Sequence, residues 1–504
     1  MKKIKIIKIT QSIYILFLLL FGFTSCSDFL DETPKTSLTE EEVYGKDENL
    51  ELLISGLYTQ WRNTRQDRSA LYFTLGSDEG KQGGQQIQEN NTQAALDKYN
   101  GALNASNSTL AGEWSKRWPV VSAAAKAVYY AKSDELKAQA AFIRASVCFD
   151  LVMLWGEIPI IDLKNMRESR QPLPDVYQFI IDDLKFASEH LPLTQQNKKI
   201  PTKGAAQALL GKVYLYAPVE SGVRNYENAV AYFDMVIPNY SLLPNYADLF
   251  NTTLNQNSSE SIYAFQFINQ SPDNNMVQHH AGSRAVADLD SNTYFGGYDL
   301  ALPTQYYHSD VWVGEDGDTR KTASIRYDFK LPDGRVPQIT WTGQSDELEP
   351  HTKKFEDIRT QGKQNFWYCG GLIYYLRLAD ILLCKAECLN ELGKTAEAVN
   401  LVNTTVRKRA YGGTLPAGKE WSSSLSKEEF RVKIMDERMR ELGFEGWRRM
   451  DLIRTGNFVN YIKERNPWAK ASGTIAEFHK WFPIPESEIK QNESINEEDQ
   501  NPGY

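Results

Sequence analysis

Acidic and basic side chains alternate near the C-terminus in a run that could carry out chemistry. Glu437 and Glu441 stand four residues apart, so they share one face of a helix. Arg448 joins that face two turns later if the helix continues through Gly443 and Gly446. Two carboxylates facing each other across a cleft would suit glycoside hydrolysis, whereas carboxylates interleaved with arginines form buried ion pairs that are costly to break. We expect the second arrangement, an ion-pair network that fastens the last helices to the scaffold.

Other patterns for catalysis or metal binding are incomplete. His279 and His280 have no third ligand nearby in the sequence, and we expect an exposed surface pair. Residues 315–318 are acidic but lack the ligand spacing of a calcium-binding hand. Neither a glycine-rich phosphate loop nor a Gly-x-Ser-x-Gly elbow occurs. We therefore predict no catalytic residue, no metal site and no cofactor, and we expect buried free thiols at Cys148, Cys369, Cys384 and Cys388.

Aromatic side chains on predicted loops are the candidates for ligand binding. Aromatic residues make up 12% of the chain, and flat rings can stack on the faces of pyranose sugars. A binding pocket combines a few such rings with well-placed polar groups. Each ring could instead pack inside the protein, which is the commoner fate of an aromatic side chain. The candidate rings are Tyr99, Tyr294, Tyr298, Trp312 and Trp341.

Composition and charge exclude some classes of protein. The chain has 504 residues, of which 41% are hydrophobic and 24% charged, as in a folded globular protein. Its formal net charge is -9, and it becomes about -13 (-9 minus 4) without the first 25 residues, which hold four lysines and no acids. Nucleic-acid binding needs a basic surface that neutralises phosphates. A nucleic-acid partner is therefore not expected.

The N-terminus resembles a lipoprotein export signal. Four lysines precede an apolar run at 9–23, and two small residues then lead to Cys26. This order predicts a cleaved signal peptide at 1–25, acylation of Cys26 and a lipidated tether at 26–40. Two or three acyl chains on one residue would anchor the protein stably to a membrane. The alternative is an ordinary signal peptide with an incidental cysteine, because Phe23 stands where leucine is commonest in lipoprotein signals.

Helical periodicity dominates the rest of the chain and predicts an all-α fold. Four helices are expected at 48–62, 118–131, 133–155 and 175–190. Two segments, 210–238 and 386–402, carry small and apolar residues at the spacing of tetratricopeptide helix pairs. Because such pairs stack in series, these two should meet in space although they are far apart in sequence. Long irregular loops are expected at 76–112, 269–304 and 310–362, and loops on a rigid scaffold commonly carry function.

Several motifs together resemble the SusD/RagB family of outer-membrane lipoproteins. They lie in the same order along nearly the whole mature chain, at 26–34, 318–320, 374–380, 436–456, 481–489 and 500–504. The resemblance implies an N-terminal region at 27–217 and a C-terminal region at 260–504, joined in one compact unit of tetratricopeptide-like helix pairs. It also implies that Asp78, in the segment 77–80, accepts hydrogen bonds from sugar hydroxyls; a turn or capping residue is the alternative.

The same resemblance implies a function. Members of the family sit as a lid over a SusC-like TonB-dependent transporter in the outer membrane and present glycans, or sometimes peptides, to it. We therefore expect a non-enzymatic, lipid-anchored oligosaccharide-binding protein on the cell surface. A peptide-binding lid of the same kind of importer, a lipid-anchored glycoside hydrolase and a protein-interaction scaffold remain the alternatives.

Overall fold

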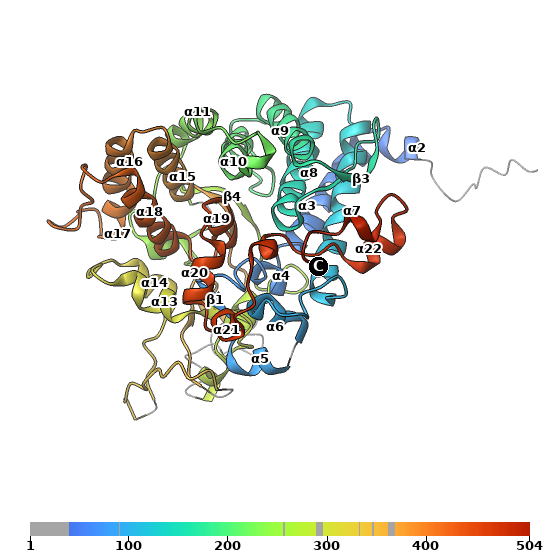
Figure 1. Ribbon diagram of the computed structural model, residues 1–504. Coiled ribbons are helices and arrows are strands. Elements are labelled where there is room, and N and C mark those ends of the chain that lie inside the picture. Colours follow the sequence, from blue (N-terminus) through green and yellow to red (C-terminus); the bar gives the residue numbers. More distant parts are fainter. Residues whose placement is uncertain are drawn as a thin grey trace, which may run out of the picture.

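Long helices follow one another around the upper part of the molecule (Figure 1). Each helix from α7 to α10 contacts the next one in the chain, α11 contacts α15, and α15 contacts both α16 and α18. This arrangement confirms the predicted helical fold with tetratricopeptide-like pairs. The long helices are α3 (Asp47–Asn63), α7 (Ser108–Tyr130), α8 (Asp134–Trp155), α9 (Leu173–His190), α10 (Lys203–Tyr216), α11 (Tyr226–Val236), α15 (Leu378–Glu391), α16 (Thr395–Val402) and α18 (Lys427–Leu442).

The computed structural model describes residues 40–504, except 90, 256–257, 289–295, 332, 345–346 and 361–367. The predicted signal peptide, Cys26 and the tether up to residue 39 lie outside the described residues. Tyr294 lies outside them as well.

Helix α8 is the central helix of the core. Its N-terminus is capped by Ser133, whose side chain accepts a hydrogen bond from the backbone N–H of Leu136. Its residues from Ala138 to Trp155 are all buried. Within the part of the chain that the structure describes, α8 is the one helix long and apolar enough to span a membrane, and its complete burial identifies it as a core helix instead.

The two tetratricopeptide-like segments form the predicted helix pairs. The first segment forms α10 and α11, and a Cβ on Gly211 would lie only 2.5 Å from Cε1 of Phe233. Glycine at 211 therefore lets the two helices approach closely. The second segment forms α15 and α16, with Ala386 and Ala398 fully buried between them. Because α11 packs on α15, the two pairs meet in space as expected.

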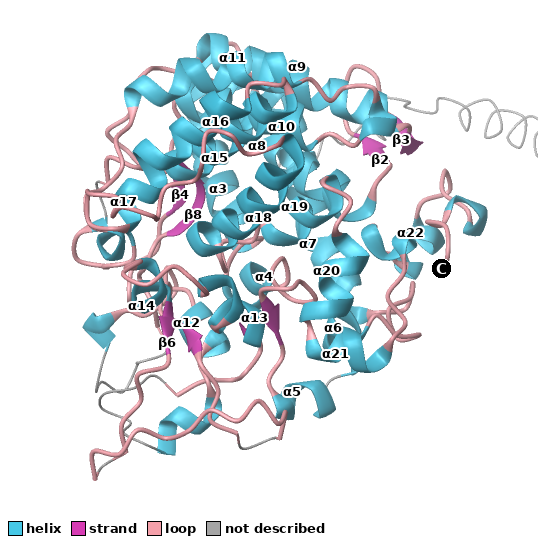
Figure 2. Ribbon diagram, turned by 60° about the vertical axis from the view of Figure 1, so that its left-hand side comes forward, coloured by secondary structure: helices cyan, strands magenta, loops and turns pink. Residues whose placement is uncertain are grey.

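Loops dominate the lower part of the molecule, and several short helices lie among them (Figure 2). The short helices are α2 (Glu40–Tyr44), α4 (Asp67–Leu71), α5 (Gly84–Glu89), α6 (Asn91–Lys98), α12 (Val277–Ala281), α13 (Gln305–His308), α14 (Arg320–Ser324), α17 (Lys408–Ala410), α19 (Arg448–Arg454), α20 (Phe458–Arg465), α21 (Pro467–Ser472) and α22 (Glu486–Gln491).

The strands are short and form two-stranded antiparallel sheets. Strand β4 (Ser261–Phe265) pairs with β8 (Ile373–Arg377), and Trp61 of α3 packs against aromatic rings of both strands, namely Tyr263, Phe265 and Tyr375. The other pairs are β1 (Gly80–Lys81) with β5 (Leu302–Pro303), β2 (Ile158–Ile160) with β3 (Arg167–Gln171), and β6 (Ile325–Arg326) with β7 (His351–Thr352).

The segment 76–112 differs from its prediction as an irregular loop. It contains β1, α5, α6 and the first turn of α7, which begins at Ser108 rather than near 118. Asn107 explains the earlier start, because its side chain accepts hydrogen bonds from the backbone N–H groups of Thr109 and Leu110. The four internal cysteines are buried free thiols, as predicted.

Candidate functional site

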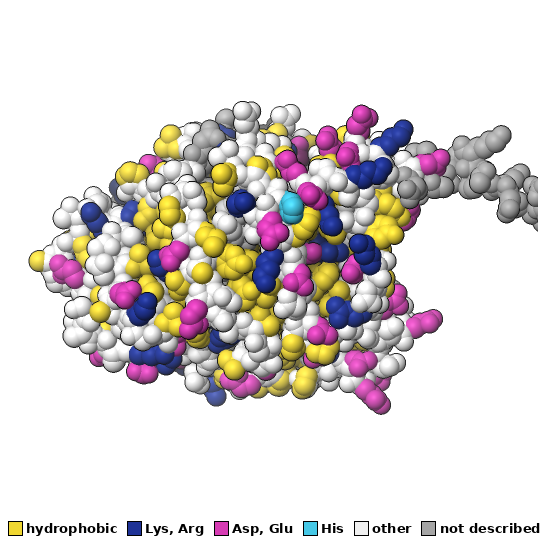
Figure 3. Space-filling view, turned by 90° about the horizontal axis from the view of Figure 1, so that it is seen from above, with side chains coloured by type: hydrophobic (Ala, Val, Ile, Leu, Met, Phe, Trp, Pro, Cys, Tyr) yellow, Lys and Arg dark blue, Asp and Glu magenta, His cyan; other side chains and the backbone are white. Residues whose placement is uncertain are grey.

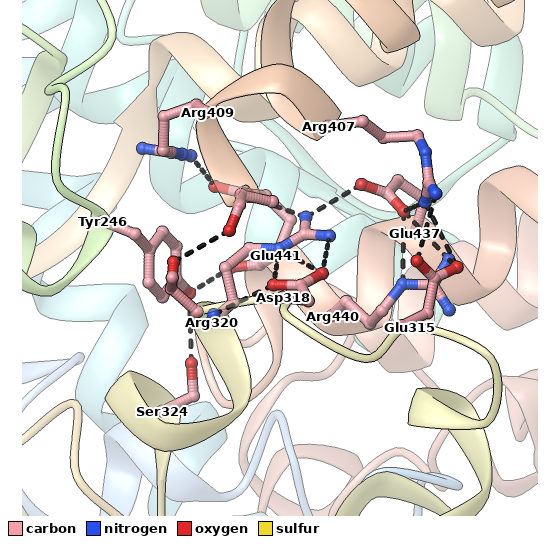
Figure 4. Close-up of polar contacts among 12 residues, drawn as sticks. Tyr246, Glu315, Asp318, Arg320, Ser324, Arg407, Arg409, Glu437, Arg440 and Glu441 are labelled. Atoms are coloured by element: carbon pink, nitrogen blue, oxygen red, sulfur yellow. Dashed lines mark hydrogen bonds and ion pairs between the residues drawn. The ribbon is translucent and has the colours of Figure 1, made fainter. Parts of the chain in front are cut away.

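The acidic run of α18 forms the centre of a buried ion-pair network (Figure 4). Arg320 lies 2.8 Å from Glu437 and 3.0 Å from Glu441, and it also pairs with Asp318 at 2.6 Å. All four of these side chains are completely shielded from solvent. Arg409 extends the network to Glu441 at 2.5 Å. The predicted ion-pair network is confirmed, and neither glutamate is accessible to a substrate.

Arg448 does not join this network on the face of α18. The helix ends at Leu442, and the chain turns away through Phe444 and Gly446, whose φ angles are 67° and 81°. Arg448 begins a new helix, α19, and donates hydrogen bonds from Nε and Nη2 to Asp78 at 2.6 and 2.7 Å. The condition that the helix continue through Gly443 and Gly446 is therefore not met.

Asp78 cannot serve as the predicted acceptor for sugar hydroxyls. It is 0% exposed, and Arg465 approaches it at 3.0 Å in addition to Arg448. Two guanidinium groups thus occupy its carboxylate oxygens. The prediction is wrong because the segment 77–80 lies beneath α19 and α20, where no ligand in solvent can reach it.

The adjacent carboxyl groups of Asp78 and Glu79 resemble the acid and base of a catalytic site. Burial raises the pKa of Glu79 to about 8, with the nearby Arg448 charge opposing the rise, whereas Asp78 is held by two arginines. A carboxyl group with a raised pKa beside a second carboxyl group is typical of catalytic sites. Glu79, however, is only 1% exposed, and its Oε1 accepts a hydrogen bond from the backbone N–H of Phe444 at 3.2 Å. Because both carboxyl groups are buried, the pair has a structural role.

The acidic segment 315–318 is occupied by basic partners. Glu315 binds Arg407 at 3.0 Å and accepts a hydrogen bond from the Tyr411 hydroxyl at 2.6 Å. Asp318 binds Arg320. These carboxylates complete ion pairs and are not arranged around a cation.

Two of the candidate rings are buried. Tyr99 is 1% exposed, and its hydroxyl donates to the carbonyl oxygen of Gly76 at 2.5 Å. Trp312 is 7% exposed, and its Nε1 donates to the carbonyl oxygen of Tyr307 at 2.7 Å. The prediction that these two rings are exposed platforms is wrong. Each ring packs inward because its polar atom finds a backbone acceptor inside the protein.

Tyr298 is an exposed ring on a firm support. It is 39% exposed. Its backbone N–H donates to the carbonyl oxygen of His279 at 2.9 Å, and Leu300 N–H donates to that of His280 at 2.9 Å. Residues 298–300 are therefore fastened to α12. A ring held in this way can accept a flat apolar partner without first being ordered, so little entropy is lost on binding.

Basic and aromatic side chains surround Tyr298. The guanidinium carbons of Arg68 and Arg284 lie 5.2 and 5.4 Å from its ring centroid. The imidazole rings of His279 and His280 lie 5.4 and 6.0 Å away. The predicted exposed histidine pair is wrong, since His280 is only 8% exposed and burial, with the Arg68 charge, lowers its pKa to about 3. We call these five residues the Tyr298 site.

Trp341 lies on the loop between β6 and β7. It is partly exposed, has a φ of 56°, and its ring centroid is 5.3 Å from that of His308. The His308 ring in turn lies 5.2 Å from Tyr327. Trp341 is the second candidate ring that the structure leaves accessible. Sequence reasoning missed Arg68, Arg284, His308 and Tyr327, because they come from separate segments and no local spacing relates them.

Among the described residues, two cavities lie away from both Tyr298 and Trp341. One, of about 480 Å³, lies between α3 and α8 and includes Glu51, Tyr58 and Gln139. The other, of about 380 Å³, lies between α15, α18 and α20 and includes Glu391 and Arg431. On the helical face seen from above, hydrophobic side chains lie between charged ones (Figure 3). None of the accessible candidate rings lines either cavity.

Family models match both halves of the chain. The model described as "SusD family" matches residues 253–504, and the one described as "Starch-binding associating with outer membrane" matches residues 28–215. A SusD-like protein of Bacteroides ovatus is 31% identical over 429 residues, covering 77% of this chain and 74% of that protein. SusD-like protein P2 of Formosa agariphila is 28% identical over 516 residues, covering 96% and 98%.

A solved structure shares the fold. Surface glycan-binding protein A from Bacteroides thetaiotaomicron, in complex with laminarihexaose, superimposes with a TM-score of 0.72 at 19% identity over 90% of this chain and 99% of that one. The tetratricopeptide-like pairs and the scaffold locked by buried ion pairs thus define a helical protein that displays loops. The chain belongs to the SusD family.

Proposed function

We propose that this chain is a cell-surface glycan-binding lipoprotein that delivers oligosaccharides to a SusC-like TonB-dependent transporter of the outer membrane. Its membership of the SusD family supports the proposal, as does the family description that matches its N-terminal half. A relative of the same fold binds laminarihexaose. Oligosaccharide is the ligand, the transporter is the protein partner, and the membrane is reached through the lipid on Cys26.

The accessibility of Tyr298 carries the proposal. Its ring is partly exposed, while the backbone on both sides is bonded to α12. A pyranose has an apolar face of axial C–H groups that stacks on such a ring, and fixed support keeps the entropic cost of stacking low. Trp341, on the loop between β6 and β7, is the second platform that we propose.

Binding without catalysis is the expected activity. A glycoside hydrolase needs two carboxyl groups on either side of an accessible bond. The carboxylates of α18 are buried in ion pairs, and Asp78 and Glu79 are shielded from solvent. These four carboxyl groups are therefore not available to act as acid and base on a glycosidic bond.

A glycan screen with product analysis tests the proposal. The processed chain would be examined against neutral and acidic polysaccharides by affinity electrophoresis and calorimetry. We expect binding without release of reducing ends, and about 10-fold or greater weakening for Tyr298→Ala, since truncating an aromatic anchor of a binding surface commonly costs about 2 kcal/mol or more. The matched control is Tyr129→Ala, because Tyr129 is 47% exposed on α7 and should not affect binding.

Other outcomes favour the alternatives. Release of sugar products would favour a lipid-anchored glycoside hydrolase, and binding of peptides but no glycan would favour a peptide-binding lid or a protein-interaction scaffold. The anchor and the partner are tested in cells. Labelled palmitate should enter the wild type but not Cys26→Ala, and the transporter should co-purify with the wild type from detergent extracts.

A further inference from the structure

The two arginines of the Tyr298 site have no strong acidic partner among the described residues. Arg68 makes no ion pair with any carboxylate among the described residues; its Nε donates to Nε2 of His280 at 3.4 Å. Arg284 reaches Asp299 only at 3.6 Å, and its side chain is 35% exposed. By contrast, the buried arginines of the α18 network each hold one or more carboxylates at 2.5–3.1 Å. Positive charge is therefore available at the Tyr298 site.

The backbone that carries Arg68 is fixed before any ligand arrives. Arg68 lies on α4, and Asp67 next to it accepts a hydrogen bond from the backbone N–H of Met276 at 2.5 Å. Gln66 donates to the carbonyl oxygen of Asn274 at 2.9 Å. The start of α4 is thus tied to the segment that leads into α12, which also supports Tyr298. A guanidinium group beside a rigid ring forms a prearranged receptor.

This combination fits an anionic sugar better than a neutral one. Guanidinium groups bind carboxylate and sulfate oxygens through two parallel hydrogen bonds. The partly buried setting reduces screening by solvent, so the attraction is stronger than at a fully exposed site. The two guanidinium carbons lie over the Tyr298 ring, 5.2 and 5.4 Å from its centroid. A pyranose that packs against the exposed part of this ring would therefore have its substituents beside the arginines.

We propose that the Tyr298 site selects acidic glycans, with a uronate carboxylate or a sulfate ester bound by Arg68 and Arg284 while the sugar ring stacks on Tyr298. The inference rests on the proposed glycan-binding function and adds the chemical class of the ligand. The net charge of the processed chain, about -13 (-9 minus 4), would repel polyanions at long range, so selectivity has to come from this local cluster.

Matched glycan pairs test the selectivity. The processed full-length chain would be titrated with polygalacturonate and carrageenan oligosaccharides, each beside its carboxyl-reduced or desulfated form. We expect the acidic member of at least one pair to bind about 10-fold more tightly or better than its neutral form, and added salt to weaken it. Preference within the first pair alone identifies uronate, and preference within the second alone identifies sulfate.

Charge-removing variants assign the effect to these residues. Arg68→Gln and Arg284→Gln should each weaken acidic-glycan binding about 10-fold and leave the melting temperature unchanged. Arg68→Lys should retain part of the affinity, because it keeps the charge but not the forked geometry. The control is Arg167→Gln, since Arg167 is a partly exposed arginine paired with Asp175 at 3.3 Å on β3.

The outcomes separate this inference from the proposed function. Equal binding of acidic and neutral forms, unchanged affinity in both glutamine variants, or equally tight binding of a single-stranded oligonucleotide overturns the acidic-glycan inference. If neutral glycans alone bind, the proposed function stands and the inference falls. If no glycan of either kind binds the folded chain, both fall.

Discussion

Arg448 donates two hydrogen bonds, of 2.6 and 2.7 Å, to the carboxylate of Asp78, although the two residues are 370 positions apart in the sequence. The pair fastens β1 and its flanking turn to the start of α19. Arg465 adds a contact at 3.0 Å from α20. One carboxylate thereby joins the N-terminal part of the chain to two helices of its C-terminal part.

Removing Asp78 should damage stability rather than ligand recognition. Asp78→Ala leaves two arginines without their buried partner, and breaking such a pair costs about 3–5 kcal/mol. Chemical denaturation followed by circular dichroism would measure the loss. Glycan affinity of the fraction that remains folded should be unchanged. A stable Asp78→Ala protein that no longer binds glycan would contradict the buried structural role of Asp78.

Glu441 should make the protein sensitive to acid. Burial alone would raise its pKa, but Arg409, Arg377 and Arg320 outweigh burial and lower the pKa to about 2. The stabilisation is therefore fully present above about pH 4.5 and is lost as the pH falls towards 2. Glu441→Gln should lose about 3–5 kcal/mol at pH 7, and its difference from the wild type should shrink between pH 4.5 and 2.

An exposed glutamate provides the control for this comparison. Glu493→Gln, on the surface near the C-terminus, should change the free energy of unfolding by no more than about 0.5 kcal/mol at any pH. A Glu441→Gln protein that unfolds in acid in parallel with the wild type would argue against the network as the acid-labile element.

Glu79 should have the opposite pH dependence. Its folded-state pKa is raised to about 8 by burial, so the folded protein keeps a proton that the unfolded chain releases near pH 4.5. Its contribution to stability is complete below about pH 4.5 and is lost as the pH rises through 8. Glu79→Gln mimics the protonated form. Relative to the wild type, it should gain roughly 3–5 kcal/mol between pH 5 and pH 8.5 in urea unfolding. Parallel profiles would show that Glu79 is not buried as described.

The helix pair α10–α11 should tolerate no side chain at Gly211. A Cβ there would lie 2.5 Å from Cε1 of the fully buried Phe233. Gly211→Ala should therefore destabilise the protein by about 1–3 kcal/mol, although alanine favours helix. Gly56 of α3 is the matched control, because nothing lies within 4 Å of its added Cβ. Gly56→Ala should stabilise by about 0.5–1 kcal/mol in thermal unfolding, and equal effects at the two positions would rule out close packing at 211.

The helical scaffold could be predicted because its signals are local. Apolar spacing located α3, α8 and α9 to within a few residues, and small residues such as Gly211 and Ala386 marked the helix pairs. The start of α7 was misplaced because its cap, Asn107, stands in a segment rich in glycine and polar residues that is typical of loops. The ion-pair network was also predicted, since glutamates and arginines alternate on one stretch of chain.

Most features of the candidate site could not be predicted, because exposure depends on distant segments. Tyr99 and Tyr298 both follow polar, loop-like sequence, yet one is buried against Arg449 while the other remains accessible beside Arg68. The sequence around Asp78 is typical of an exposed loop, but in the folded protein α19 places Arg448 against its carboxylate. No short-range pattern encodes which loop covers which side chain.

A crystal structure of the protein with a bound oligosaccharide from the screen would show whether the sugar binds at Tyr298. We expect a sugar ring stacked on Tyr298, with hydroxyl or anionic groups within hydrogen-bonding distance of Arg68 or Arg284, and the ion-pair network around Glu441 unchanged. A ligand bound instead in the cavity between α18 and α20, with the Tyr298 ring empty, would contradict this expectation.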